Sequence, residues 1–323
     1  MILDVNEHCV NKLIFLNNRR KIERDLFAVM KDIAKIEMEY VWKIAIAPSK
    51  NYVESVKKIS KQLNTERIAS ETALACVIVG KYNEEIKQAM VINEEIFKGL
   101  ILFLYDKKVK EDRNKDELAM LGIQIFFHEC GHLKEGIKSL KLGRNIILNK
   151  VQYNLENAKE LSQYIDEQSF GMWGEYYAES FKYKMLNNII NVPLETNGLE
   201  QKILEYVNIL ESCYNKKSML IKEQYETAYV LLYEYVHYIS YFHIVKDKNV
   251  KLKNLKKINN KKLINRLNRI GRLLKKTYLK YENENIKLDQ LEKICKNSYL
   301  SIINIKNDNV IRKIKYWVGY FIN

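Results

Sequence analysis

The scarcity of glycine and proline restricts the fold of this chain more than any other feature. The 323 residues include only 11 glycines and 2 prolines. Architectures made entirely of strands need many tight turns, which these two residues commonly supply. A turn-rich all-β protein is therefore disfavoured, and long helices are expected. Hydrophobic residues make up 47% of the chain, enough to form the core of one large domain or two ordinary ones.

The N-terminal part is predicted to be mainly helical. Residues 1–70 read as helix because apolar residues recur at helical spacing between Arg24 and Val41, and a break is expected at Ala47-Pro48-Ser49. Three short apolar runs follow. They are predicted to form two or three strands, the first two joined as a hairpin: Ala75–Val79, Gln88–Ile92 and Gly99–Tyr105.

Helices dominate the rest of the chain. One is predicted to begin near Asn114 or Asp116, either of which can cap it, and to end at Gly136. Further helices are expected in the 150s and over Trp173–Asn188. From about Glu200 onward the pattern is helical almost throughout, and it includes Met219–His243 and Lys261–Tyr281.

The helix predicted to end at Gly136 carries the segment His128-Glu-Cys-Gly-His132. Histidines four residues apart lie one turn apart on one helix face, so both imidazoles can bind one zinc ion at about 2.0–2.1 Å. Glu129 then lies beside the metal, where it can take a proton from water and return it to the leaving group. The motif predicts a zinc-dependent hydrolase with His128 and His132 as ligands and Glu129 as general base. The alternative is a pair of ordinary helix histidines.

A catalytic zinc commonly has a third protein ligand and one open position for water. In metzincins a glycine and a third histidine follow the motif at fixed spacing, and the segment HECGHLKEGIK has neither in register, which excludes that class. Downstream, Trp173-Gly-Glu-Tyr-Tyr-Ala-Glu179 places Glu175 and Glu179 on one predicted helix face, with the small Ala178 available for close packing. The competing carboxylates are Asp166, Glu167 and, more weakly, Glu135 on the motif helix.

These two segments resemble the gluzincin metallopeptidases, including the ImmA/IrrE-type intracellular peptidases of phages and mobile elements. Those proteins share a short sheet, an HExGH helix and a Glu in an ExxA context, and the match covers roughly residues 72–190. The resemblance implies a zincin-like core, Glu175 as third zinc ligand, and Glu179 as the carboxylate that hydrogen-bonds a ligand histidine. Gluzincins often place a His or Tyr at the developing oxyanion, and His237 is the residue expected there, with His243 as its neighbour.

The charge of the chain is concentrated in one segment. The formal net charge is +14, and Lys246–Lys276 alone contains 13 lysines and arginines against one acid, Asp247. Such a segment can bind a phosphate backbone. It also has an apolar stripe typical of a packed amphipathic helix with a solvated basic face, formed by Leu263, Ile264, Leu267, Ile270 and Leu274. Nucleic acid is therefore a possible partner, and an acidic protein is another.

The five cysteines are widely spaced and form no CxxC pair, which argues against a disulfide scaffold or a cysteine zinc site. No signal peptide is visible at the N-terminus, and no apolar run is long enough for a membrane span. The cytoplasm is therefore the expected location.

Together these features predict an α+β protein in three parts. Residues 1–64 form a helical segment, residues 65–195 a zincin-like core with a short antiparallel sheet and the active-site helices, and residues 196–323 an all-α domain. The expected activity is hydrolysis of peptide bonds in a protein or peptide substrate by zinc-activated water. The alternative is a nucleic-acid- or partner-binding protein of a mobile element, in which the metal site is structural or silent.

Overall fold

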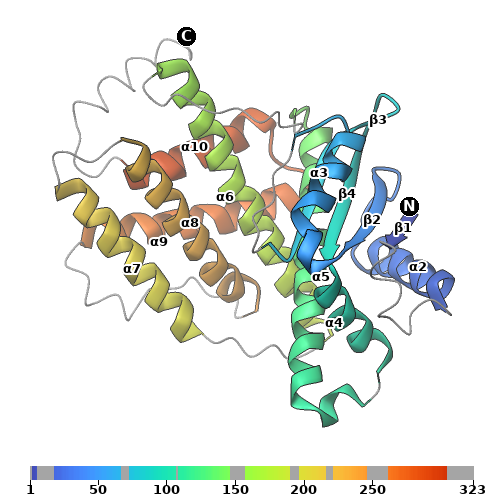
Figure 1. Cartoon of the computed structure of the whole chain (residues 1–323). Coiled ribbons are helices and arrows are strands. Elements are labelled where there is room, and N and C mark those ends of the chain that lie inside the picture. Colours follow the sequence, from blue (N-terminus) through green and yellow to red (C-terminus); the bar gives the residue numbers. More distant parts are fainter. Residues whose placement is uncertain are drawn as a thin grey trace. The chain divides into compact units, whose positions relative to one another are not determined.

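The computed structural model describes residues 2–5, 18–66, 73–106, 108–145, 157–189, 196–215, 221–245 and 261–303. The fold is α+β, and the chain divides into two compact units (Figure 1). The first unit comprises Met1–Gln152 and Tyr177–Val192, and the second comprises Tyr153–Tyr176 and Pro193–Asn323. Helix α6 (Ala158–Asn187) runs unbroken through both. Within the described ranges, no helix combines the length and the apolar character needed to cross a membrane.

The first unit is built on a four-stranded mixed sheet with the order β1-β2-β4-β3. Its strands are β1 (Ile2–Val5), β2 (Val41–Ala47), β3 (Ala75–Tyr82) and β4 (Glu85–Asn93). β1 and β4 run parallel to β2, and β3 runs antiparallel to β4. The predicted hairpin is confirmed, and its two turn residues, Asn83 and Glu84, both have positive φ. The expectation of a purely antiparallel sheet is wrong, because strands from the N-terminal segment join the hairpin in parallel.

The N-terminal segment is less helical than predicted. The helix expected to reach Val41 instead comprises α2 (Arg19–Ala28) and a π-helical turn to Ile33, and it stops before Lys35, whose φ is 54°. β2 follows, and its apolar residues are buried on both faces of the sheet, so it lacks the alternation that marks a half-exposed strand. Because β1 and β2 pair with the rest of the sheet, the described residues within 1–64 belong to the first unit.

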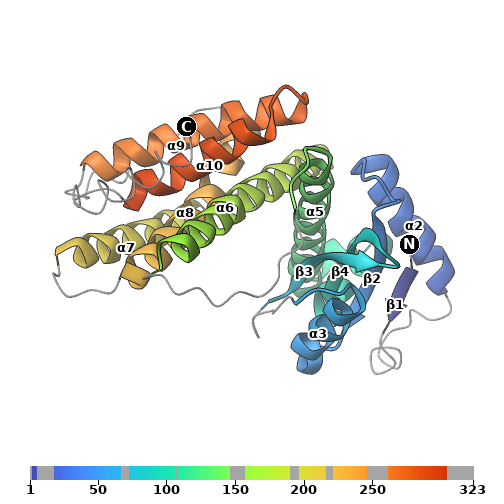
Figure 2. The ribbon, with the colours of Figure 1, turned by 90° about the horizontal axis from the view of Figure 1, so that it is seen from above.

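Helices cover both faces of this sheet (Figure 2). On one face α3 (Tyr52–Gln62) buries Tyr52, Val56 and Ile59 in a cluster with alternate residues of β2, β3 and β4. On the opposite face lie α4 (Glu94–Tyr105) and α5 (Arg113–Lys141). Gln88 of β4 points to this side, where its amide nitrogen donates to the Leu133 carbonyl of α5 at 3.3 Å.

The third predicted strand, Gly99–Tyr105, is wrong, because these residues belong to α4. Asn93 caps this helix by accepting a hydrogen bond from the Glu95 amide, and two glutamates occupy the first turn. The apolar run Ile101–Tyr105 by itself does not distinguish a strand from a buried helix. Close contact of Gly99 with the backbone of α5 at Leu118 lets the two helices pack tightly.

The helix predicted to carry the two motif histidines is confirmed as α5, with slightly different ends. Asp112 caps it, with its carboxylate accepting from the amides of Asn114 and Lys115. The helix passes through Gly136, which packs against the Gln88 side chain, and ends at Lys141 before Gly143, whose φ is 90°. Gly136 is therefore a packing residue and not the helix end.

Within its described residues the second unit consists of helices. They are the N-terminal half of α6, α7 (Thr196–Asn215), α8 (Ile221–Ile244), α9 (Lys261–Glu282) and α10 (Leu288–Ile303). The helices predicted over Met219–His243 and Lys261–Tyr281 are thus confirmed as α8 and α9. The α9 stripe residues Leu263, Leu267 and Leu274 are fully buried, as expected of an amphipathic helix. The rest of the basic segment, residues 246–260, lies outside the described residues.

Candidate metal centre

The centre forms where α5 meets the part of α6 that belongs to the first unit. A Cβ atom placed on Gly131 would lie 2.6 Å from the Ala178 Cα and 3.0 Å from its carbonyl oxygen. Glycine is therefore required at position 131, since the two backbones touch there. This contact brings the helix turn that carries His128 and His132 against the turn that carries Glu179.

The ring nitrogens of the two motif histidines face each other. The Nε2 atoms of His128 and His132 are 3.0 Å apart, and the ring planes are nearly perpendicular at 81°. Two nitrogens bound to one tetrahedral zinc at about 2.0–2.1 Å would lie about 3.3–3.4 Å apart. The observed spacing is therefore close to that required for both imidazoles to bind the same ion, with only a small adjustment.

Glu175 completes the group of potential ligands. One ligand atom from each of His128, His132 and Glu175 lies within 4.8 Å of the others. Glu175 lies one helical turn before Glu179 on the same face of α6, and α6 is continuous through the boundary between the units. The position of Glu179 against α5 therefore also determines on which side of the histidines Glu175 lies.

Glu179 orients the first histidine. Its Oε1 accepts a hydrogen bond of 2.8 Å from His128 Nδ1, and only 3% of its side chain is exposed. A proton on Nδ1 leaves the Nε2 lone pair directed toward the metal position. This is the contact that the resemblance to gluzincins implied for Glu179.

Lys182 is a residue of this centre that the sequence analysis missed. Its Nζ donates to both carboxylate oxygens of Glu179, at 2.8 and 2.6 Å, and only 11% of its side chain is exposed. The sole sequence signal is the spacing of three residues from Glu179, which is common for exposed helix pairs. Here the pair is buried, so Lys182 holds the Glu179 carboxylate in a defined orientation.

Glu129 and Cys130 separate the two histidines along α5. Glu129 is buried, with 6% of its surface exposed, and it lies one residue from a potential ligand, where a general base is expected. Cys130 is fully buried, and burial followed by the nearby charge of Glu129 raises the pKa of its thiol well above the usual value. Among the described residues, the group that could hold a metal does not include Cys130, so this side chain serves as a packing residue.

The chemistry of the three potential ligand atoms indicates which metal this centre fits. No protein-family model, curated protein or solved structure matches this chain. Two imidazole nitrogens and one carboxylate oxygen make up a ligand set found in catalytic zinc sites that keep a fourth position open. The residues present therefore fit zinc.

The competing carboxylates have other contacts. Asp166 pairs with Lys296 at 2.8 Å, and it precedes Glu175 by nine residues, which is about 13 Å along the helix. Glu135 is buried on α5 and accepts a hydrogen bond from Ser139 at 2.6 Å. Among the described residues, the group that could hold a metal contains neither of these acids nor Glu167.

His237 and His243 lie on α8 in the second unit. His237 Nδ1 donates to the Tyr233 carbonyl one turn earlier at 2.8 Å, and its ring packs against the Tyr233 ring. His243 is buried and its Nδ1 is 2.8 Å from the Tyr176 hydroxyl. Burial, together with the charge of Lys275, lowers the pKa of His243 to about 4. These are packing contacts, and the oxyanion role of His237 stays a prediction.

Proposed function

We propose that this protein is a zinc-dependent metallopeptidase of the gluzincin type, with a zincin-like core. The convergence of His128 Nε2, His132 Nε2 and a Glu175 carboxylate oxygen, next to the buried Glu129, is the observation that carries this proposal. Ordinary helix histidines have no need for a buried carboxylate that sets the tautomer of one ring, and His128 has that partner in Glu179.

Each side chain then has a separate task. Zinc held by His128, His132 and Glu175 would supply a Lewis acid that polarises a carbonyl and lowers the pKa of water. Glu129 takes the proton of the attacking water and passes it to the amine that leaves when the peptide bond breaks. Glu179 keeps the His128 Nε2 atom deprotonated, and His237 remains the proposed stabiliser of the oxyanion.

A protein or peptide substrate is proposed because the same arrangement of two histidines, a base and a helix glutamate acts on amide bonds in the gluzincins that this chain resembles. We also propose the cytoplasm as its location. The five cysteines are widely spaced and form no CxxC pair, as expected of a protein that folds in a reducing compartment.

The decisive experiment separates metal binding from proton transfer. Glu129→Gln keeps the size of the side chain but makes it a far poorer base, so the variant should fold and bind zinc while peptide cleavage falls by about 10²–10⁴-fold. Glu135→Gln is the matched control, because Glu135 is a second buried glutamate on α5 that bonds to Ser139. Zinc content, melting temperature and cleavage of a proteome-derived peptide library are measured for all three proteins.

Equal cleavage by the wild type and Glu129→Gln would refute the mechanism. A zinc-loaded wild type that cuts no peptide, and that binds nucleic acid in a salt-sensitive way, would instead favour the alternative, a nucleic-acid- or partner-binding protein of a mobile element with a silent metal site.

A further inference from the structure

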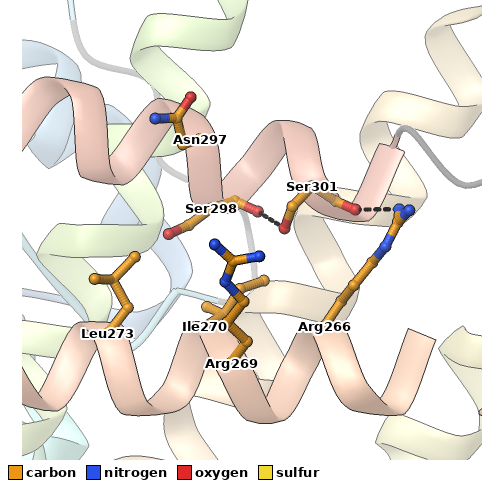
Figure 3. Close-up of a pocket in the computed structure, with 7 residues that line it drawn as sticks. All are labelled: Arg266, Arg269, Ile270, Leu273, Asn297, Ser298 and Ser301. Carbon is orange, nitrogen blue, oxygen red and sulfur yellow. Dashed lines mark hydrogen bonds between the residues drawn. The ribbon is translucent and has the colours of Figure 1, made fainter. Parts of the chain in front are cut away.

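We propose that a pocket between α9 and α10 binds the phosphate group of a small organic phosphate. The pocket has a volume of about 370 Å³ and lies within the second unit (Figure 3). Its walls are formed by two arginines, three small polar residues and two aliphatic residues: Arg266, Arg269, Asn297, Ser298, Ser301, Ile270 and Leu273. None of them belongs to the candidate metal centre, so this site stands or fails independently of the proposed peptidase activity.

The two arginines supply positive charge that no carboxylate in the described part of the chain neutralises. Arg266 Nη1 donates to the Ser301 carbonyl at 2.6 Å near the end of α10, and its remaining N–H groups have no partner among the described residues. Arg269 makes no hydrogen bond or ion pair with any described residue, and its guanidinium extends from α9 toward α10 (Figure 3). In contrast, Lys296 on α10 pairs with Asp166.

The α10 wall adds an unused polar group. Ser298 is 2% exposed, and its Oγ is buried without a hydrogen-bond partner among the described residues. A buried hydroxyl without a partner lowers stability, so its retention in a pocket wall indicates that a ligand satisfies it. The hydroxyl of Ser301 donates to the Ser298 carbonyl at 2.8 Å, and its oxygen can still accept.

The combination of groups defines the chemistry of the ligand. Guanidinium groups bind phosphate oxygens through charge-assisted hydrogen bonds, and a serine hydroxyl can donate a further one. Ile270 and Leu273 form an apolar wall beside them, so the ligand carries an apolar or aromatic group next to its phosphate. The volume is at the small end of the range for ligand pockets, about 300–1,000 Å³, and is appropriate for a mononucleotide.

The surrounding charge also favours an anion. Helix α9 contains eight lysines and arginines and a single acid, Glu282. A field of this sign raises the local concentration of phosphate-bearing molecules. The phosphate can come from a free mononucleotide or from a nucleotide within a single strand of nucleic acid, and both present the same chemistry to Arg266 and Arg269.

Isothermal titration calorimetry on the full chain tests this inference. The probes are adenosine 5′-monophosphate, adenosine, inorganic phosphate and a short oligodeoxythymidylate. The monophosphate should bind measurably and adenosine much more weakly, because the phosphate provides the charge-assisted contacts. Arg269→Met should reduce phosphate-dependent binding at least about tenfold, since it removes a guanidinium and keeps an apolar chain of similar reach.

Two variants make the result interpretable. Arg272→Met removes a charge from the same helix at a position outside the pocket, so binding should change little. Ser298→Ala should weaken binding while leaving the melting temperature equal or higher, because it deletes a hydroxyl that has no partner. A purely structural serine would give the opposite pattern.

The outcomes divide clearly. Arg269-dependent binding of the monophosphate identifies a free nucleotide as the source of the phosphate, and Arg269-dependent binding of the oligonucleotide alone identifies nucleic acid. Both support the site. Equal affinity for adenosine and its monophosphate, equal losses in Arg269→Met and Arg272→Met, or no binding of any phosphate probe would overturn it.

Discussion

Gly131→Ala is the substitution that most directly tests the packing on which the metal centre depends. In an isolated helix this change should stabilise by about 1 kcal/mol, because alanine is the better helix former. In α5, however, the new Cβ would lie 2.6 Å from the Ala178 Cα. Carbon atoms ordinarily pack at about 3.5–4.0 Å, so the two helices would have to separate by roughly 1 Å.

The expected effect on stability follows from the balance of these terms. Overpacking of this kind costs about 1–3 kcal/mol, so the net change is a loss of about 0–2 kcal/mol after the helix-propensity gain. The effect on metal binding is larger. Ligand groups must be held to within about 0.5 Å, and the separation would pull Glu179 from His128, a loss typically worth about 10–100-fold in metal affinity.

Gly136→Ala on the same helix is the matched control. Its Cβ would meet the end of the Gln88 side chain at 3.0 Å, and a side chain can rotate away where a backbone cannot. Zinc affinity is measured by competition with a chelator, and stability by thermal unfolding of the zinc-free proteins. If Gly131→Ala matched Gly136→Ala in both measurements, the contact between α5 and α6 would be refuted, and the proposed ligand arrangement with it.

Three further predictions concern individual side chains. Glu175→Gln should reduce zinc from about one per chain to a small fraction, whereas Asp166→Asn should keep full zinc content, as measured by elemental analysis. Lys182→Met should cost the zinc-free protein about 3–5 kcal/mol by leaving the buried charge of Glu179 uncompensated, and zinc should then stabilise this variant more than the wild type in thermal unfolding. The pKa of His243 is lowered to about 4 in the folded chain, so below about pH 6.5 the unfolded chain binds a proton that the folded chain excludes. The free energy of unfolding, measured in urea, should therefore fall by up to about 3 kcal/mol as the pH is lowered from about 6.5 to 4. His243→Gln should remove this pH dependence.

Strong periodicity was what made parts of the fold predictable. α5, α8 and α9 each contain many turns of helical pattern, and the β3–β4 hairpin has a short polar turn between two apolar runs. β2 and α4 failed for a common reason. Val41–Ala47 of β2 and Gly99–Tyr105 of α4 are both nearly continuous apolar runs, which by themselves do not distinguish a strand from a helix.

The candidate site likewise contains residues that the sequence predicts and residues that it does not. His128, Glu129 and His132 follow from residue types at a fixed spacing, since a helix turn alone brings the two imidazoles together. The contact between Glu179 and His128 instead joins two residues that are 51 positions apart in sequence and lie on different helices. Only the resemblance to gluzincins suggested it. Lys182 could not be identified, because a lysine three residues after a glutamate is most often an exposed pair and its burial depends on tertiary packing.

Charge balance connects these residues. The carboxylates of Glu129, Glu175 and Glu179 carry three formal negative charges, and Lys182 carries one positive charge. The four side chains together therefore have a net formal charge of −2. Glu129 and Glu179 are almost fully buried, where a charge is costly unless it is paired. In the proposed site, a divalent cation held by neutral imidazoles would bring this set to zero, and a monovalent cation would not. The residues proposed as ligands and base would therefore also favour an ion of charge two.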